Sequence, residues 1–228
     1  AFVKGNMSAA LERLGTPEGV KEFRAMASVE YEDWDNFCLT LGWDRILITG
    51  IVNEENRKFI GMNVREAAEK YGFEDDYALA AYLMHHEGGR TAIINMSMCQ
   101  DDIDEIVRLP YSVFISDSIY AEKSMPHPRM YGAFPKVIRE YVNERHLLPL
   151  EEAIRKMTYL PAKRMRLAGK GLLKVGYDAD INIFDPKEFK DHATYSDPER
   201  MATGLDYCIV NGRVAYYNGA KTEDSYGQ

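Results

Sequence analysis

The chain has 228 residues, which is enough for one large domain or two small domains, each with a core of its own. Hydrophobic residues make up 46% and charged residues 28%, the balance of an ordinary soluble globular protein. The net charge of −8 argues against nucleic acid or an anionic membrane as the main partner, and no apolar run approaches the roughly 20 residues that span a bilayer.

Cysteine usage and the N-terminal sequence indicate the compartment. Cys38, Cys99 and Cys208 are widely spaced and odd in number, so neither a disulfide framework nor a cysteine zinc site is expected. No signal-peptide pattern opens the sequence, and we expect a cytoplasmic protein. The sequence begins at Ala1 without a methionine, which fits a mature product, a split subunit or an excised piece of a longer protein.

A first zone, residues 1–110, is expected to be mainly helical with two short strands. Thr16 as N-cap, Pro17 at the first helical position and Glu18 in the first turn predict a helix start. Asn63 is a second expected cap, and Gly88-Gly89 is an expected helix stop. The predicted helices cover residues 17–28, 64–72, 74–87 and 101–108, and the predicted strands cover 46–52 and 91–96.

A second zone, residues 111–170, opens with an apolar run that ends in a carboxylate. Ser112–Asp117 reads as a buried parallel strand that delivers a side chain to a site. An irregular stretch should follow to Arg129. Helices are then predicted over 134–145, 150–158 and 161–167.

A third zone, residues 171–228, is predicted to be β. A strand is expected at 181–184 and a hairpin at 207–210 and 213–217, turning at Asn211-Gly212. So few strands leave edges and an apolar face without cover, and we therefore expect the chain to associate with itself.

Two residues are candidates for chemistry. Asp117 follows the predicted strand at the place where barrel enzymes present catalytic groups, although a helix cap or a loop aspartate would look the same. Arg129 lies twelve residues later, and its fork of donors suits a substrate carboxylate, although a surface arginine in a loop is the alternative.

The histidines are interpreted as structural. His85 and His86 are adjacent on a predicted helix and diverge by about 100°, so both cannot easily face one ion. His146 and His192 stand alone in polar surroundings. A hydrolytic zinc site needs about three protein ligands, and the sequence offers Asp117 without a clear companion.

Several segments taken together resemble the N-acyl-D-amino-acid deacylase (D-aminoacylase) family of the amidohydrolase superfamily. The resemblance runs from about residue 10 to 222, and its most specific part is His127-Pro128-Arg129 with Gly132 and Phe134-Pro135, followed by Gly176-Tyr177-Asp178-Ala179-Asp180. The other matching segments are Trp43–Ile48, Ile115–Asp117, Leu150–Thr158, Leu160–Ala162, Gly171–Ile181 and Val210–Gly212.

The resemblance implies the C-terminal portion of a larger α/β enzyme, with an α+β appearance in this chain alone. Residues 1–110 would be a helical insertion domain, residues 111–170 the last strand of a TIM-like barrel and the helices after it, and residues 171–228 part of a C-terminal β-sandwich. The missing N-terminal half would supply most ligands of one or two zinc ions.

The resemblance also implies roles for both candidate residues. Asp117 would bind metal and act as the catalytic acid–base, and Arg129 would bind the carboxylate of a small-molecule substrate, an N-acyl-D-amino acid. The isolated chain would then hold no zinc tightly and be inactive.

Two departures leave alternatives open. Serines, Ser116 and Ser118, replace the glycines that usually flank the aspartate, and residues 119–125 lack the usual acidic and histidine pattern. A cyclic-amide amidohydrolase of the dihydroorotase or hydantoinase kind is one alternative. A non-catalytic interaction domain is the other. The amino-acid side chain and acyl group, the number of metals and the oligomeric state do not follow from the sequence.

Overall fold

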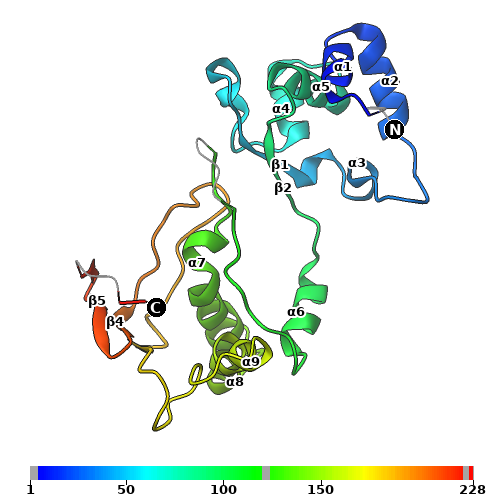
Figure 1. The fold of residues 1–228 in the computed structure, drawn as a ribbon. Coiled ribbons are helices and arrows are strands. Elements are labelled where there is room, and N and C mark those ends of the chain that lie inside the picture. Colours follow the sequence, from blue (N-terminus) through cyan, green and yellow to red (C-terminus); the bar gives the residue numbers. More distant parts are fainter. Residues whose placement is uncertain (1–4, 120–123, 223–225, 228) are drawn as a thin grey trace. The chain divides into compact units, whose positions relative to one another are not determined.

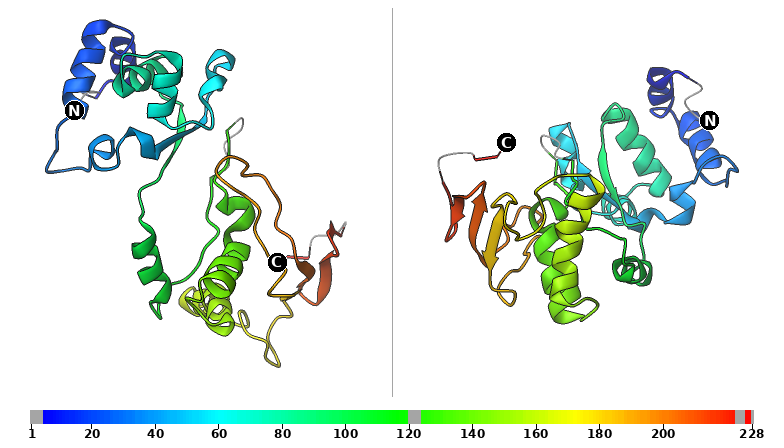
Figure 2. Two further views of the ribbon diagram at one scale, coloured as in Figure 1. Left: turned by 180° about the vertical axis from the view of Figure 1, so that it is seen from behind. Right: turned by 60° about the horizontal axis from the view of Figure 1, so that its bottom comes forward.

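The computed structural model describes residues 5–119, 124–222 and 226–227. These fall into two units, one from the described parts of 1–97 and 120–126, the other from those of 98–119 and 127–228 (Figures 1 and 2). The predicted zone boundaries near residues 110 and 170 stay predictions. Residues 1–4, and residues 120–123 of the irregular stretch, lie outside the described residues.

The first unit is built from short helices, several of which begin at a side-chain cap. The Gly19 amide donates to Thr16 Oγ1 (3.1 Å) and the Glu66 amide to Asn63 Oδ1 (2.8 Å), which confirms both predicted helix starts. Gly72 ends its helix at a φ of 72°. The helical elements are α1 (Met7–Arg13), α2 (Pro17–Ala27), α3 (Phe37–Thr40), η1 (Trp43–Arg45), η2 (Glu54–Phe59), α4 (Val64–Tyr71) and α5 (Asp76–His86).

Two antiparallel strands complete this unit. Strand β1 (Ile46–Gly50) pairs with β2 (Ala92–Asn95), and Ile48 is fully buried among residues of α4 and α5. Both predicted strands are confirmed. A later part of the chain joins their edge, because Ser124 bridges Gly50 and the Met125 amide donates to Thr49 O (2.7 Å).

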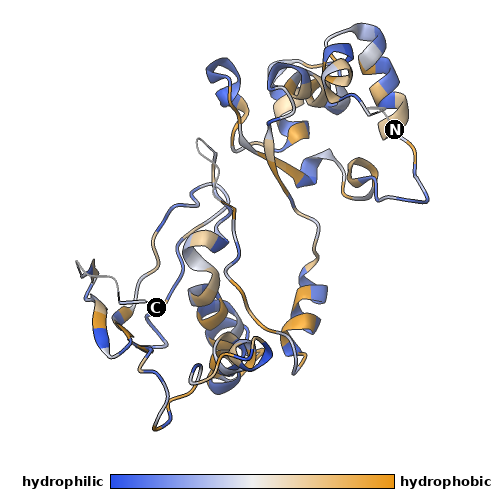
Figure 3. Ribbon diagram, viewed as in Figure 1, coloured by the Kyte–Doolittle hydropathy of each residue, from blue (hydrophilic) through white to orange (hydrophobic). Residues whose placement is uncertain are grey.

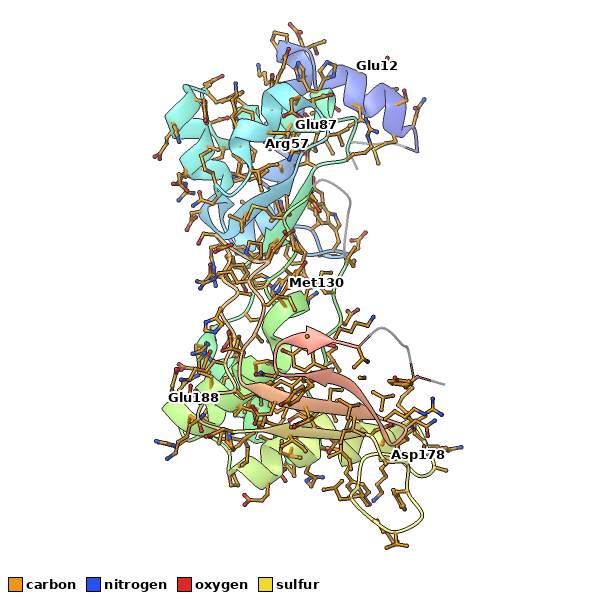
Figure 4. All side chains as sticks on the ribbon, turned by 90° about the vertical axis from the view of Figure 1, so that its left-hand side faces the viewer. Glu12, Arg57, Glu87, Met130, Asp178 and Glu188 are labelled. Carbon is orange, nitrogen blue, oxygen red and sulfur yellow. The ribbon has the colours of Figure 1, made fainter. Side chains whose placement is uncertain are left out.

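Glu87, which directly follows α5, is a fully buried carboxylate of the first unit (Figure 4). It accepts hydrogen bonds from the amides of Val52 and Asn53 (both 2.9 Å) and from Asn56 Nδ2 (2.6 Å). Burial alone would raise the pKa of this carboxyl, but the hydrogen bonds outweigh it and the pKa is lowered. Glu87 therefore fixes the loop after β1 as an anion.

The helices of the second unit surround a second core. Helix α6 (Gln100–Arg108) shows apolar and polar residues on different sides (Figure 3). Val107 packs with Ile138, Tyr141 and Ala153. The remaining helices are α7 (Arg129–Lys136), the π-helix η3 (Val137–Glu144), α8 (Leu150–Met157) and α9 (Tyr159–Arg164).

The helix predicted over 134–145 is longer at its N-terminal end, since α7 begins at Arg129 and runs directly into η3. Pro135 lies inside this helix. Its ring provides no N–H and crowds the preceding turn, and the wider π register begins two residues later.

The strand predicted over Ser112–Asp117 is wrong for this structure, because residues 112–119 form neither strand nor helix. Ile115 is 66% and Ile119 82% exposed. A parallel strand needs a neighbouring strand to pair with, and within the described residues no strand pairs with this segment.

The C-terminal part forms an antiparallel sheet in the order β3 (Ile181–Phe184), β4 (Leu205–Val210), β5 (Arg213–Tyr217), β6 (Ala220–Lys221). Asn211 and Gly212 have φ values of 53° and 75°, so the predicted hairpin is confirmed. Ile183 and Val214 are exposed, whereas Phe184 packs against the core of the second unit. The mixed α/β class predicted from the sequence is confirmed, and none of the described helices is long and apolar enough to cross a membrane.

Candidate functional site

Asp117 lies near the end of the irregular segment that leaves α6. Its side chain is exposed, and serines flank it on both sides. The Ser118 hydroxyl oxygen is buried and has no hydrogen-bond partner among the described atoms.

Arg129 begins α7 and contacts the candidate aspartate through its backbone. Arg129 Nε donates to the carbonyl oxygen of Asp117 at 2.5 Å. In the described part of the chain, neither Nη group of Arg129 has a hydrogen-bond partner, and the side chain is exposed. The structure thus brings the two candidate residues together through the Arg129 side chain and the Asp117 backbone.

His127 fixes the start of the same helix, whose first turn carries Met130 (Figure 4). Its Nδ1 accepts the Arg129 backbone N–H (3.0 Å), and its Nε2 lies 3.4 Å from the Tyr195 hydroxyl. Burial, then the charges of Arg129 and Lys136, lower the pKa of His127 to about 4. The imidazole is therefore neutral at pH 7, with its proton on Nε2 facing Tyr195.

The other histidines bond to nearby groups of the protein. Nδ1 of His85, His86 and His146 donates to the carbonyls of Leu11 (2.7 Å), Tyr82 (2.9 Å) and Val142 (2.9 Å), and His192 Nε2 lies 2.8 Å from Thr203 Oγ1. Each ring thus has a structural contact.

The described residues do not fit a zinc site by themselves. Among them, no group of three or more histidine, cysteine, aspartate or glutamate side chains is arranged to hold a metal ion. A catalytic zinc site uses about three protein ligands and an open position. Asp117 would therefore need ligands from outside this part of the protein.

Two residues near Asp117 and Arg129 were missed by sequence reasoning. Tyr195 lies 68 positions beyond its partner His127, and Lys156 bonds to residues 44 to 49 positions earlier. Lys156 lies in a segment that resembles the deacylase family, and burial is the property that sequence did not indicate.

The family follows from comparison with known proteins. A family model described as the amidohydrolase family matches residues 24–216. The chain belongs to this family.

Among individual relatives, the chain is similar to deacylases of Alcaligenes xylosoxydans xylosoxydans. It is 36% identical over 162 residues to an N-acyl-D-aspartate deacylase, covering 71% of this chain and 31% of the relative. It is 37% identical over 135 residues to a D-aminoacylase, covering 59% and 28%. The chain thus spans about a third of the length of the curated relatives it matches.

Solved structures give the same picture. An N-acyl-D-glutamate deacylase from Bordetella bronchiseptica, complexed with zinc and a phosphonate inhibitor, matches with a TM-score of 0.69 at 29% identity, covering 81% of this chain and 36% of that one. A D-aminoacylase studied for its binuclear metal centre matches with a TM-score of 0.71 at 28% identity, covering 92% and 45%.

Proposed function

We propose that this chain is the C-terminal part of a metal-dependent hydrolase that cleaves the amide bond of N-acyl-D-amino acids. The observation that carries the proposal is the contact between Arg129 and Asp117, in a chain similar to an N-acyl-D-aspartate deacylase and an N-acyl-D-glutamate deacylase. The substrates in those names share a free α-carboxylate beside the amide that is cleaved.

Arg129 binds that carboxylate in this proposal. Its Nε is already used by Asp117 O, so the two Nη groups form the contact with the substrate. A guanidinium edge offers a carboxylate two parallel charge-assisted hydrogen bonds. The substrate is thereby held beside the residue that performs the proton transfers.

Asp117 acts as the general base and then as the general acid. Its carboxylate takes a proton from the attacking water and returns it to the nitrogen of the leaving amine. Zinc, present in the similar deacylase structure, would lie at this aspartate with ligands from other parts of the longer protein, and it would supply Lewis-acid activation of the amide.

The finer architecture belongs to the same proposal. We propose that residues 112–117, which form no strand in this chain alone, pair as the last strand of a TIM-like barrel in the longer protein. Residues 171–228 would be part of a β-sandwich, and residues 1–110 an inserted helical domain. The apolar but exposed Ile115 and Ile119 support this, because barrel neighbours would cover them. The exposed Val214 and Ile183 of the sheet support a missing sandwich layer in the same way.

Asp117→Asn in the longer protein tests the proposal. We expect wild-type protein loaded with zinc to hydrolyse an N-acetyl-D-amino acid, and the variant to lose at least about 1,000-fold in kcat at similar KM, since an amide cannot accept the proton. Asp101→Asn, on an exposed position of α6, is the matched control and should keep full activity. Turnover of a hydantoin or dihydroorotate in place of the N-acyl substrate would favour a cyclic-amide hydrolase, and no turnover of either would favour a binding domain.

A further inference from the structure

A buried lysine lies behind the segment that carries Asp117. Lys156, on α8, is 0% exposed. Its Nζ donates to Val107 O (2.8 Å), to Ser112 Oγ (2.8 Å) and to Leu109 O. All three acceptors belong to the end of α6 and the turn that follows it.

The hydrogen-bond count identifies the side chain as an ammonium. The carbonyls of Val107 and Leu109 can only accept, and with the Ser112 hydroxyl also accepting, three N–H donors are needed, which the protonated form provides. Ser112 can accept because its own hydroxyl hydrogen goes to Leu109 O (3.0 Å). Burial lowers the pKa of Lys156, and the three oxygens compensate for part of that unfavourable desolvation.

Two arginines extend this contact along the same turn. Arg155 Nη2 donates to Pro110 O (2.8 Å) and Arg164 Nη2 to Tyr111 O (3.1 Å). With Lys156 they form what we call the basic clasp: Arg155, Lys156 and Arg164. Carbonyl oxygens at the end of a helix favour cations, and here Val107 O, at the end of α6, and the carbonyls of the turn after it each receive one.

The basic clasp contacts the turn from which the segment with Asp117 leaves. The amide of Phe114 donates to the carbonyl of Lys156 itself (3.4 Å), so a single residue of α8 contacts the chain from Val107 to Phe114. Three residues further on, Asp117 O accepts from Arg129 Nε. The segment is therefore held at both ends, although it forms no regular structure.

We propose that Lys156 is a positioning residue for Asp117, fixing the turn at residues 109–112 so that the segment leaving it presents the aspartate in one place. The catalytic part of this inference rests on the proposed function. A buried methionine would fill similar space without the cost of burying a charge. What methionine cannot supply is three directed hydrogen bonds.

The first experiment follows backbone exchange in this chain and needs no substrate. Lys156→Met should accelerate hydrogen exchange of the Ser112 and Phe114 amides, the amides of 112–117 that donate within the described residues, by about tenfold or more, because the anchor of their turn is lost. Lys163→Met, an exposed lysine on the neighbouring α9, removes the same charge and should leave these amides unchanged. Ser112→Ala removes one acceptor of Lys156 and the hydroxyl's own hydrogen bond to Leu109 O. It leaves the other two contacts of Lys156 and should give a smaller effect in the same direction, which covers the case in which Lys156→Met does not fold.

The second experiment measures turnover in the longer protein. Lys156→Met should lower kcat by about 10- to 100-fold with KM nearly unchanged, because a misplaced catalytic group loses rate, and Lys156→Arg should recover part of the loss. Exchange of the Ser112 and Phe114 amides that matches wild type, or that rises equally in all of the second unit, would overturn the proposal. If wild type hydrolyses no N-acyl-D-amino acid, the proposed function fails, while faster exchange confined to the Ser112 and Phe114 amides still supports the anchor.

Discussion

Arg129 serves two contacts with one side chain. Its Nε donates to the backbone of Asp117, while its Nη groups bind the substrate carboxylate in the proposed role. A lysine could donate to that carbonyl, but its ammonium cannot also offer a carboxylate the planar pair of N–H groups that an arginine offers. This residue therefore links substrate recognition to the position of the aspartate.

Substitution of Arg129 should be measured with two substrates in the longer protein, an N-acyl-D-amino acid and its neutral α-amide. Arg129→Ala should lower kcat/KM for the carboxylate by roughly 30- to 1,000-fold, equivalent to about 2–4 kcal/mol, and Arg129→Lys should recover little. Wild type should lose activity on the neutral amide, whereas the alanine variant should barely distinguish the two. Equal discrimination by both enzymes would show that Arg129 does not bind the carboxylate.

His127 should make the stability of this chain depend on pH. Its pKa is lowered from 6.5 to about 4, so between these values the unfolded chain binds a proton that the folded chain does not, and stability falls as the pH falls through this range. His127→Asn keeps an acceptor for the Arg129 amide but does not titrate. In denaturant unfolding from pH 7 to pH 4, the variant should lose less stability than wild type, and parallel curves would contradict the burial of a neutral imidazole.

At the level of single residues, the sequence predicted the candidate site residues Asp117 and Arg129 but not the residues that hold them in place. Asp117 and Arg129 were found because an apolar run ending in aspartate and a loop arginine are local patterns, though their assigned roles stay predictions. Tyr195 and Lys156 were not found, since each acts on residues far away in the chain. A lysine in an amphipathic helix gives no local sign that it is buried.

Among the elements, tight turns show most clearly how single residues determine structure. The second hairpin turns at Asn218 and Gly219, with φ values of 45° and 88°, and it pairs β5 with the unpredicted β6. Gly204 also has a positive φ, 84°, and lies where the chain bridges Lys190 and Thr203. A Cβ on Gly204 would lie 2.1 Å from Glu188 O, whereas one on Gly219 would meet no atom within 4 Å.

These two glycines form a matched pair for a stability test. Gly219→Ala should cost about 1 kcal/mol, the ordinary penalty of the left-handed conformation. Gly204→Ala should cost about 2–4 kcal/mol, since the clash with backbone adds to the same penalty. Denaturant unfolding of both variants measures the difference. Equal losses of stability would mean that the backbone of residue 188 lies too far from residue 204 to clash with an alanine Cβ.

Helices and turns that depend on residues nearby in the sequence could be predicted, and a strand that depends on partners far away in the chain could not. Helices α2 and α4 follow from the caps Thr16 and Asn63, and the β4–β5 hairpin follows from Asn211-Gly212. The segment 112–117 has the composition of a buried strand, but a strand exists only when neighbours bond to it. Its apolar residues fit a buried strand between two others, and no such neighbouring strands lie in the described part of this chain.

On the scale of the whole molecule, the chain carries apolar surface without cover. Ile115 and Ile119 of the second unit are largely exposed, as are Leu173 and Val175 before the sheet. In our proposal the rest of the longer protein covers these residues. In its absence, self-association of the isolated chain stays the expectation drawn from the sequence.

Zinc content tests the central claim most directly, namely that Asp117 belongs to a metal site whose other ligands lie outside residues 1–228. Tag-free chain and tag-free longer protein are dialysed against chelator, reloaded with zinc, desalted and measured by elemental analysis. We predict about one or two zinc ions per longer protein, fewer after Asp117→Asn, and no stoichiometric zinc in the chain alone. Stoichiometric zinc in the chain alone, or zinc in the longer protein that is unaffected by Asp117→Asn, would contradict the account.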